Sequence, residues 1–412
     1  MEGVVIVGAG HTGAQAAKTL RQEGWRGAIV LIGAETEPPY QRPPLSKDIL
    51  TGVKTLSECG LFEGPFLARH EIDWRAGTRA VAINRATQEI VLDDGSSVPY
   101  GRLLLATGAE PRRLTVPETG RGDIRYLRSA GDARGLADAI RRRRRLIIVG
   151  GGFIGLEVAA AAAARGCNVT VVEAGPRLVM RSVPTEIERL LAARHRLAGV
   201  TFHLNRQVVG IRWAHGTVEL DLDDGSALHG DTILAAIGVA PRVELAEAAG
   251  LAIDNGVAVD ATLRTSDPNI FAAGDASSFP HGLFGGRIRL ECWKSAEDQG
   301  AVAARNMLGA GEEYGGAPWL WSDQYELSIQ VAGLPAPGAN CVTRPAQGGG
   351  LLVFQLTGDG RLVSASGIGS EGAIGRDIRV AQLMIERGIR PSAEALADPA
   401  VRLKSLLVAK AA

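Results

Sequence analysis

The sequence predicts an α/β fold in which two similar βαβ units are followed by a small α+β domain. Residues 3–8 (GVVIVG) form a β-branched run that ends in glycine, and an alanine-rich segment with helical spacing leads to a second apolar run at residues 28–32. The same pattern recurs in residues 146–151 (LIIVGG), 153–165 and 168–173 (NVTVVE). Two βαβ units of one design indicate duplicated halves.

The segments between and after these units predict where the domains begin and end. Residues 88–92 and 102–106 are expected to be short strands around a turn at 93–95, and the proline-bounded segment 111–117 is expected to cross to the next domain. Residues 235–242 (AAIGVAPR) resemble residues 105–112 (LATGAEPR), which predicts a second crossing. We therefore expect one discontinuous domain at 1–112 and 241–318, a second at 113–240 and a third at 319–412.

The third domain is predicted from strand-like runs such as residues 351–355 and from helical spacing at residues 378–387. A chain of 412 residues is long enough for several such cores.

Composition excludes several classes of protein. The chain carries 45 Lys+Arg and 45 Asp+Glu, so no global charge points to a nucleic acid or a membrane surface. No apolar run reaches 18 residues, and the N-terminus has no signal-peptide pattern, which predicts a cytoplasmic protein. The four cysteines show neither CxxC nor metal-ligand spacing, so reduced thiols and no metal site are expected.

The first βαβ unit contains a glycine fingerprint between its strand and its helix. Glycines permit a tight turn and close approach of a pyrophosphate to the positive helix N-terminus, so a Rossmann-like dinucleotide site is expected here. Glu35, which follows the second strand, is the candidate ligand of the adenosine ribose; the alternative is a solvated loop residue. The expected contacts of the loop come from Gly8, Gly10, His11, Thr12 and Gly13.

The second βαβ unit repeats the fingerprint and ends its second strand in an acid. Glu173 stands where a carboxylate can accept bonds from both ribose hydroxyls and repel a 2′-phosphate, which favours NADH. Arg177 and Arg181 follow closely, so some use of NADPH stays open, and ordinary solvated surface is an equal alternative for them. The expected loop contacts come from Gly150, Gly152, Phe153, Ile154 and Gly155.

Two dinucleotide sites in one chain imply a resident redox group, FAD, and a diffusible hydride donor. Six segments then carry a family resemblance: VVIVGAGHTG (residues 4–13), PPYQRPPLSK (38–47), LLLATGAEPR (103–112), IIVGGGFIGLE (147–157), IFAAGDAS (270–277) and WLWSDQ (319–324). In this order they resemble the ferredoxin and rubredoxin reductases that serve bacterial oxygenases and cytochromes P450. The resemblance covers almost the whole chain and implies a glutathione-reductase-like fold.

The resemblance implies roles for particular residues. Lys47 is the sharpest catalytic candidate, because an ammonium beside the flavin can stabilise the charge that builds up on reduction, and Glu157 would orient it. Asp275, after Gly274, would bond the ribityl and pyrophosphate region of FAD. Arg42 and Pro44 would lie beside the flavin on a rigid proline step. Further cofactor contacts are implied for Ala106, Thr107, Gly108, Arg112, Trp321, Ile237 and Gly238.

Trp293 is a third catalytic candidate, because it could cover the flavin or the electron exit. The family commonly has an asparagine two positions later, where this chain has Ser295, which puts a side-chain contact in doubt. Trp319 and Trp321 could screen the flavin, with Trp321 favoured, although aromatic clustering is equally expected at a domain interface.

The implied activity is transfer of a hydride from NADH to FAD, followed by single-electron transfer to a [2Fe–2S] ferredoxin. Arg289 and Lys294 are candidate ferredoxin contacts, whereas the arginine run 141–145 is expected to be a solvated helix end, because it precedes its strand. The histidines, which include His195, show no ligand spacing and are expected to be structural.

Two alternatives to this activity stay open. The first is an NADH oxidase or disulfide reductase of the same superfamily, although Cys59 follows the PPLSK segment instead of preceding it. The second is an NADH-sensing flavoprotein resembling apoptosis-inducing factor.

Overall fold

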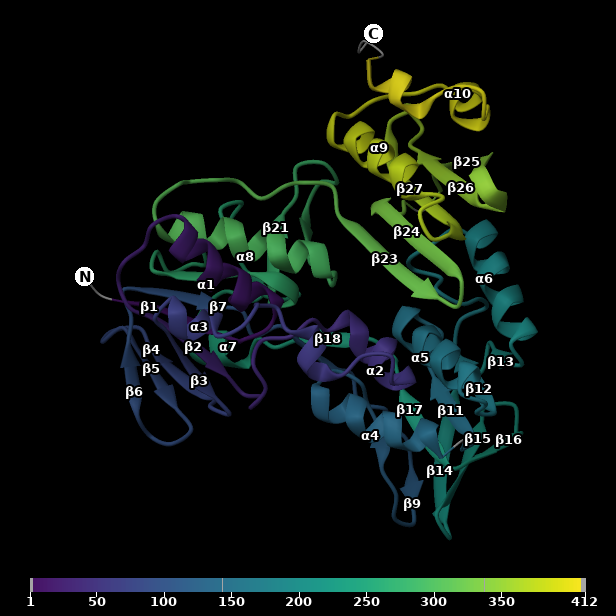
Figure 1. Cartoon of the computed structure of the whole chain (residues 1–412), viewed down its shortest axis with the longest axis horizontal. Helices are drawn as coiled ribbons and strands as arrows, with labels where there is room; N and C mark the ends of the chain where they lie inside the picture. Colours follow the sequence, from purple (N-terminus) through teal and green to yellow (C-terminus); the bar gives the residue numbers. More distant parts are fainter. Residues whose placement is uncertain (1–2, 143, 337, 409–412) are drawn as a thin grey trace. The chain divides into compact units, whose positions relative to one another are not determined.

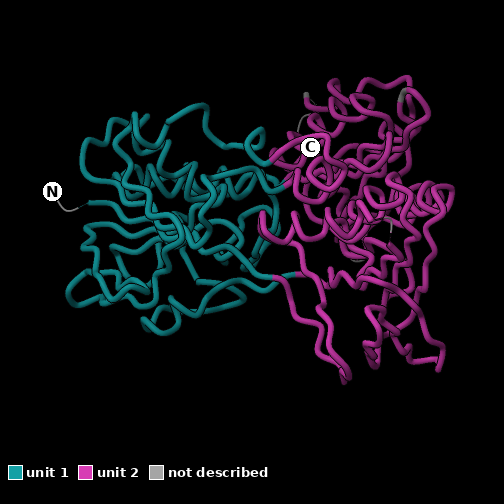
Figure 2. The backbone as a smooth tube through the Cα atoms, turned by 60° about the horizontal axis from the view of Figure 1, so that its bottom comes forward, with its two compact units in different colours: residues 1–42, 56–110, 239–318 teal, residues 43–55, 111–238, 319–412 magenta. Residues whose placement is uncertain are grey.

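The computed structural model describes residues 3–142, 144–336 and 338–408, and the chain forms two compact units. The first unit comprises Met1–Arg42, Leu56–Glu110 and Val239–Pro318, and the second comprises Pro43–Thr55, Pro111–Gly238 and Trp319–Ala412 (Figure 2). The chain passes between the units near residues 110 and 238, close to the predicted crossings. The segment 43–55 and the predicted third domain both belong to the second unit.

The first unit is built on a five-stranded parallel sheet of order β20-β7-β1-β2-β3. The central strand β1 (Val4–Val7) is buried along its whole length, as a strand covered on both faces must be. Helix α1 (His11–Gln22) and helix α8 (Trp293–Met307) lie side by side over this sheet (Figure 1). The other strands are β2 (Ile29–Gly33), β3 (Ile72–Ala76), β7 (Arg102–Leu105) and β20 (Ile270–Ala272).

Glycines allow α1 to approach its surroundings closely. A Cβ on Gly13 would lie 1.9 Å from the Gly8 carbonyl oxygen, and a Cβ on Gly300 of α8 would lie 2.4 Å from the Thr12 carbonyl oxygen. Any larger residue at either position would force backbone atoms apart, so these glycines fix how α1 packs on its loop and on α8.

The second unit repeats the arrangement with a parallel sheet of order β10-β17-β11-β12-β13. The strands β17-β11-β12-β13 correspond in order to β7-β1-β2-β3 of the first unit, which confirms the predicted duplication. The helices of this part of the unit are α4 (Ala130–Arg141), α5 (Phe153–Ala164) and α6 (Thr185–Leu197). Its strands are β10 (Ile124–Arg125), β11 (Leu146–Val149), β12 (Val169–Glu173), β13 (Thr201–Leu204) and β17 (Thr232–Ala235).

The predicted C-terminal α+β domain is confirmed as a five-stranded antiparallel sheet of order β23-β24-β27-β26-β25 with helix α9 (Gly375–Glu386) packed on it (Figure 1). Apolar residues of this sheet, such as Ile329 and Ile368, share one core with Leu156 of α5 and Leu191 of α6. This common core explains why the domain is part of the second unit. Its strands are β23 (Trp319–Gln324), β24 (Leu327–Gly333), β25 (Asn340–Pro345), β26 (Leu351–Leu356) and β27 (Leu362–Ser370).

Smaller elements complete the two units. In the first unit they include α3 (Phe66–Arg69), α7 (Glu244–Ala248), the hairpin strands β4 (Ala80–Asn84), β5 (Glu89–Leu92) and β6 (Ser97–Pro99), and β19 (Val257–Ala258), β21 (Ser277–Pro280) and β22 (Arg287–Ile288). In the second they include α2 (Asp48–Thr51), α10 (Ala393–Ala397), β9 (Glu118–Thr119), β14 (Val208–Ala214), β15 (Thr217–Leu222) and β16 (Ala227–Gly230). Strands β8 (Ala109–Pro111) and β18 (Val239–Pro241) pair with each other. In the described part of the chain, no helix is both long and apolar enough to cross a bilayer.

Candidate dinucleotide and redox sites

The first glycine loop joins the carboxyl end of β1 to the start of α1. No side chain caps the first turn of this 12-residue helix. A Cβ on Gly10 would meet nothing nearer than the Arg42 guanidinium at 4.0 Å, so open space lies at the positive end of the helix dipole. Such a cradle fits the pyrophosphate of a dinucleotide, as the sequence predicts.

The second glycine loop has the same construction at the start of α5. Gly150 has a φ of 111°, and a Cβ on it would lie 2.3 Å from the Ala236 carbonyl oxygen, just as a Cβ on Gly8 would lie 2.1 Å from that of Ala106. A Cβ on Gly152 would meet nothing within 4 Å, and no side chain caps α5. Each unit therefore offers one open cradle for a pyrophosphate.

Glu35 is held by two neighbours on its own loop. Arg42 donates to its Oε1 atom at 2.9 Å, and the Tyr40 hydroxyl donates to its Oε2 atom at 2.6 Å. The two charged side chains are about 30% exposed, so water still reaches them. The structure thus joins two predicted FAD-site residues, Glu35 and Arg42, in one ion pair, and their contacts with the cofactor stay a prediction.

Glu173 bonds the loop of its own unit. Its Oε2 atom accepts a hydrogen bond from the Gly151 amide at 2.6 Å, and its Oε1 atom accepts one from the Gly175 amide at 2.7 Å. The neighbouring Arg177 donates to the carbonyl oxygens of Met180 and Val183, both at 2.9 Å. Arg177 is therefore engaged in shaping its loop.

Lys47 and Glu157, predicted as partners across 110 positions of sequence, form an ion pair with Nζ and Oε1 2.9 Å apart. The Glu157 side chain is only 4% exposed, and a buried carboxylate is costly unless its oxygens accept hydrogen bonds. The Ser322 hydroxyl donates to Oε1 at 2.6 Å, and the Ser46 hydroxyl donates to Oε2. The sequence did not predict a role for either serine. Each is adjacent to a predicted site residue, because Ser46 precedes Lys47 and Ser322 follows Trp321.

The predicted flavin-side motif at Gly274 packs against the first glycine loop. A Cβ on Gly274 would lie 2.3 Å from the Thr12 hydroxyl oxygen, and the Gly274 amide donates to the Gln299 side chain at 2.8 Å. Asp275 follows in a short 3-10 turn, Gly274–Ala276, so it lies beside the start of α1. The buried Gln299, which orients this turn, is a third site residue that the sequence did not predict.

Two of the predicted tryptophans lie in different units. Trp293 begins α8, and its ring meets the His11 ring edge-on with centroids 6.2 Å apart, which brings it to the first glycine loop. Trp321 lies in β23 and stacks on Trp319 with centroids 5.2 Å apart. The cluster of Trp319 and Trp321 is therefore real, and its relation to a flavin stays a prediction.

The remaining predicted contacts lie after strand ends or at helix starts. Residues 106–108 follow β7, and the Thr107 hydroxyl donates to the Arg242 carbonyl oxygen at 2.8 Å. Residues 237–238 follow β17, and the Gly238 carbonyl oxygen accepts a hydrogen bond from the Arg112 amide at 3.0 Å. Pro44 lies in a 3-10 turn, Pro43–Ser46, and Phe153 and Ile154 form the first turn of α5. Carboxyl ends of parallel strands are where ligands of such sheets bind.

The arginine run lies where a solvated helix end was predicted, apart from Arg143, which is outside the described residues. Arg141 ends α4, is well exposed and pairs with Asp138. Arg145 pairs with Asp231 at 2.7 Å. Lys294, in α8, pairs with Asp298, and Arg289 pairs with Glu291 at 2.5 Å.

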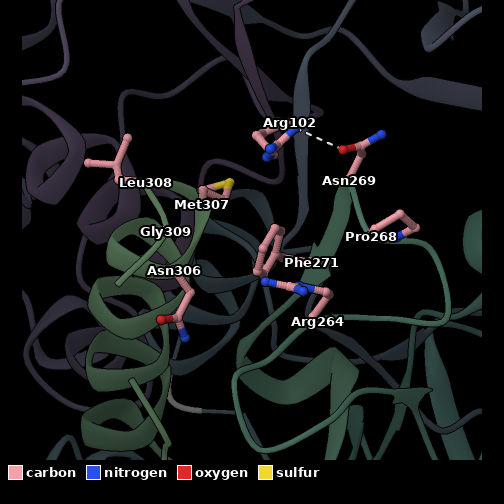
Figure 3. A pocket seen from close by; sticks show the side chains of 9 residues that line it. All are labelled: Arg102, Arg264, Pro268, Asn269, Phe271, Asn306, Met307, Leu308 and Gly309. Atoms are coloured by element: carbon pink, nitrogen blue, oxygen red, sulfur yellow. Dashed lines mark hydrogen bonds between the residues drawn. The ribbon is translucent and has the colours of Figure 1, made fainter. Parts of the chain in front are cut away.

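A pocket of about 290 Å³ opens at the amino ends of strands β7 and β20 of the first sheet (Figure 3). Arg102, which begins β7, donates to Asn269 at 2.8 Å, and the Arg264 guanidinium lies 5.6 Å from the centre of the Phe271 ring. Met307, the last residue of α8, also lines it. This pocket lies at the amino ends of the strands, so it is separate from the glycine loop.

Comparisons with known proteins agree with this geometry. A family model described as pyridine nucleotide-disulphide oxidoreductase matches residues 2–300, and one described as reductase C-terminal matches residues 319–407. The anthranilate 1,2-dioxygenase system ferredoxin–NAD(+) reductase component of Burkholderia cepacia is 44% identical over 405 residues, 98% of either chain.

Two solved structures are similar over nearly the full chain. The ferredoxin reductase for the CYP199A2 system from Rhodopseudomonas palustris has a TM-score of 0.93 at 34% identity and covers 99% of this chain and 100% of its own. The reductase in the covalent putidaredoxin reductase–putidaredoxin complex has a TM-score of 0.91 at 34% identity, with 98% of each chain covered.

Proposed function

The chain belongs to the pyridine nucleotide-disulphide oxidoreductase family, and from that premise we propose that it is an FAD-dependent, NADH-oxidising ferredoxin reductase. The proposed acceptor is a small [2Fe–2S] ferredoxin that feeds an aromatic-ring dioxygenase or a cytochrome P450. The names of the relatives support the acceptor, because one is a ferredoxin–NAD(+) reductase component of a dioxygenase system and another is bound to putidaredoxin. NADH is a cytoplasmic reductant, and we propose a cytoplasmic location.

The observation that carries the proposal is the presence of two open pyrophosphate cradles, one in each unit. FAD fits the first, where Gly10 leaves open space and Asp275 and Trp293 lie beside the same loop. NADH fits the second, at Gly152. When bound, FAD supplies a group that accepts a hydride and returns electrons one at a time.

The chain's own residues then have separate tasks. The glycine loops and helix N-termini bind the pyrophosphates. By the family resemblance, we propose that the Lys47 ammonium stabilises the negative charge that builds up on the flavin, while Glu157, fixed by two serine hydroxyls, orients the ammonium. Trp293, by the same resemblance, covers the flavin or the electron exit.

We propose that NADH is preferred over NADPH because Glu173 presents a carboxylate at the second loop and Arg177 is engaged by backbone carbonyls. A 2′-phosphate would meet like charge from Glu173. Replacing Glu173 by glutamine is expected to lower the preference for NADH, as the ratio of the two kcat/KM values, by roughly tenfold, because a repulsion worth about 1.4 kcal/mol is removed. Arg165→Gln, at the exposed C-terminal end of α5, serves as the control on surface charge. An unchanged ratio in E173Q would contradict the role of Glu173.

Cysteine chemistry is the discriminating test against the oxidase and disulfide-reductase alternative. All four cysteines lie in the described residues, and none of them forms a disulfide. Cys59 is buried, 3% exposed, at the end of a 3-10 turn, Leu56–Cys59. The Cys59→Ala variant is expected to turn over within about twofold of the wild type in NADH-dependent ferredoxin reduction, because loss of a small core group changes packing only. A loss of turnover of about a hundredfold, with the fold intact, would favour the thiol mechanism.

The activity itself is tested with the purified, FAD-loaded protein. NADH is expected to bleach the flavin under anaerobic conditions, and the reduced protein is expected to reduce a [2Fe–2S] ferredoxin in stopped flow. Bleaching without electron transfer to any member of a ferredoxin panel would overturn the proposed acceptor. A long-lived complex with NADH and negligible ferredoxin turnover would point to the sensing alternative.

A further inference from the structure

A chain of buried polar side chains runs from Glu157 through the β23–β24 hairpin to helix α6, all within the second unit. Gln324 donates from Nε2 to the Ser322 hydroxyl oxygen at 3.0 Å, and its Oε1 atom lies 2.7 Å from His195 Nε2. The Tyr325 hydroxyl lies 3.0 Å from His195 Nδ1. Ser322 and His195 are 0% exposed and Gln324 is 2% exposed, so the chain is sealed from water along its middle.

The hydrogen bonds of this chain have one consistent direction. Ser322 must donate its only proton to the Glu157 carboxylate, so it accepts from the Gln324 amide nitrogen. The Gln324 oxygen then accepts from His195 Nε2, which leaves Nδ1 to accept from the Tyr325 hydroxyl. Every donor therefore points toward Glu157, where the Ser46 hydroxyl and the Lys47 ammonium also converge.

The protonation states agree with this direction. Burial lowers the pKa of His195 to about 4, against a smaller opposing effect of its bond to Gln324, so the ring is neutral at pH 7 and has one acceptor nitrogen. Burial raises the pKa of Tyr325 to about 12, so its hydroxyl keeps the proton that it donates. An amide in the middle of the chain does not pass protons readily, so the chain fixes positions and is not a proton path.

The outer end of the chain is anchored on α6. Tyr325 occupies the left-handed region with a φ of 57°, an uncommon conformation for a residue other than glycine, at the two-residue tip of the hairpin. The guanidinium carbon of Arg194 lies 3.9 Å from the centre of the Tyr325 ring. The same guanidinium donates to both carboxylate oxygens of Glu326, at 2.7 and 3.0 Å. These contacts hold the tip of the hairpin in place. They therefore also fix, from α6, the position of Ser322, which lies three residues before Tyr325 in β23.

We propose that Gln324 and His195 are positioning residues, which hold the Ser322 hydroxyl on Glu157 and thereby fix the Lys47 ammonium for its task. The inference rests on the proposed function of the Lys47–Glu157 pair. It gives the C-terminal domain a part in hydride transfer, because β23 supplies both Ser322 and Gln324. A buried network of this kind is costly when incomplete, so loss of one member disturbs the others.

The test compares Gln324→Met with Gln355→Met in the full-length, FAD-loaded protein. Gln355 is a matched control, because it is a buried glutamine of the same sheet, in β26. Its amide nitrogen donates to Cys341 Sγ at 3.8 Å, and Cys341 is not a member of the chain of residues above. Q324M is expected to slow flavin reduction at saturating NADH about tenfold with KM changed less than twofold. It is also expected to shift the equilibrium constant for two-electron reduction of the flavin about threefold, whereas Q355M changes neither quantity.

The decisive measurement is a double-mutant cycle with Glu157→Gln. If Gln324 acts through Glu157, the tenfold effect of Q324M disappears in the E157Q background. A full tenfold effect in that background, or a wild-type rate in Q324M, would overturn the inference while E157Q alone still supports the proposed role of the pair. A wild-type rate in E157Q alone would overturn both. Tyr325→Phe repeats the cycle from the half-buried end of the chain if Q324M does not fold.

Discussion

Replacing Gly155 by alanine is expected to lower flavin reduction by NADH about a hundredfold or more, although FAD stays bound. Gly155 lies in the first turn of α5, and a Cβ there would lie 2.2 Å from the Gly150 carbonyl oxygen, which is a backbone atom and cannot rotate away. The loop must open to admit the methyl group, so the cradle for the pyrophosphate is lost. Overpacking of this kind costs about 1–3 kcal/mol of stability. Stopped-flow reduction and denaturant unfolding measure the two effects.

Gly152→Ala is the matched variant in the same loop. Its Cβ would meet no protein atom within 4 Å, and its φ of −78° is accessible to alanine. The stability of G152A is therefore expected to stay within about 0.5 kcal/mol of the wild type. Because the methyl group occupies the space where the pyrophosphate is proposed to bind, KM for NADH is expected to rise about tenfold. An unchanged KM in G152A would show that the cradle is not the binding site.

Much of the fold could be predicted because short segments of the sequence carry the patterns of strands, glycine loops and helices. Each glycine loop lies between a buried β-branched strand and a helix, and the two units repeat one strand order. The resemblance paired Lys47 with Glu157, and the side chains are 2.9 Å apart. What the patterns did not predict is that residues 43–55 and 319–412 group with the second βαβ unit, because that grouping depends on a core assembled from distant segments.

The surroundings of Glu157 were less predictable, for a physical reason. His195 was expected to be merely structural, since it shows no ligand spacing, yet it lies in a hydrogen-bonded chain that ends on Glu157. Its neighbours in that chain are more than 120 residues away in sequence and come together only through the packing of a hairpin on α6. Local sequence carries no signal for such a contact. Similarly, the backbone amides that bond Glu173 depend on loop shape rather than residue type.

Replacing Lys47 by methionine is expected to slow hydride transfer from NADH about a hundredfold, the size expected when one preorganised charge is removed from a developing negative charge. The substitution also leaves Glu157, with a side chain 4% exposed, without its cation. Removal of one partner of a buried ion pair costs about 3–5 kcal/mol, and the two serine donors place the expected loss at the lower end of that range. Lys54→Met, which breaks an exposed pair with Asp48 in the same segment, is the control and is expected to leave the rate unchanged.

The double variant K47M/E157Q separates the two consequences of this loss. With the carboxylate replaced by a neutral amide, no unpaired charge stays buried, so most of the lost stability is expected to return in denaturant unfolding. The rate of flavin reduction is not expected to return, because the ammonium is still absent. Recovery of both stability and rate would mean that Lys47 serves only to neutralise Glu157, and the electrostatic role proposed for it would be wrong. Recovery of stability alone would assign the ammonium to the reaction and the carboxylate to holding it there.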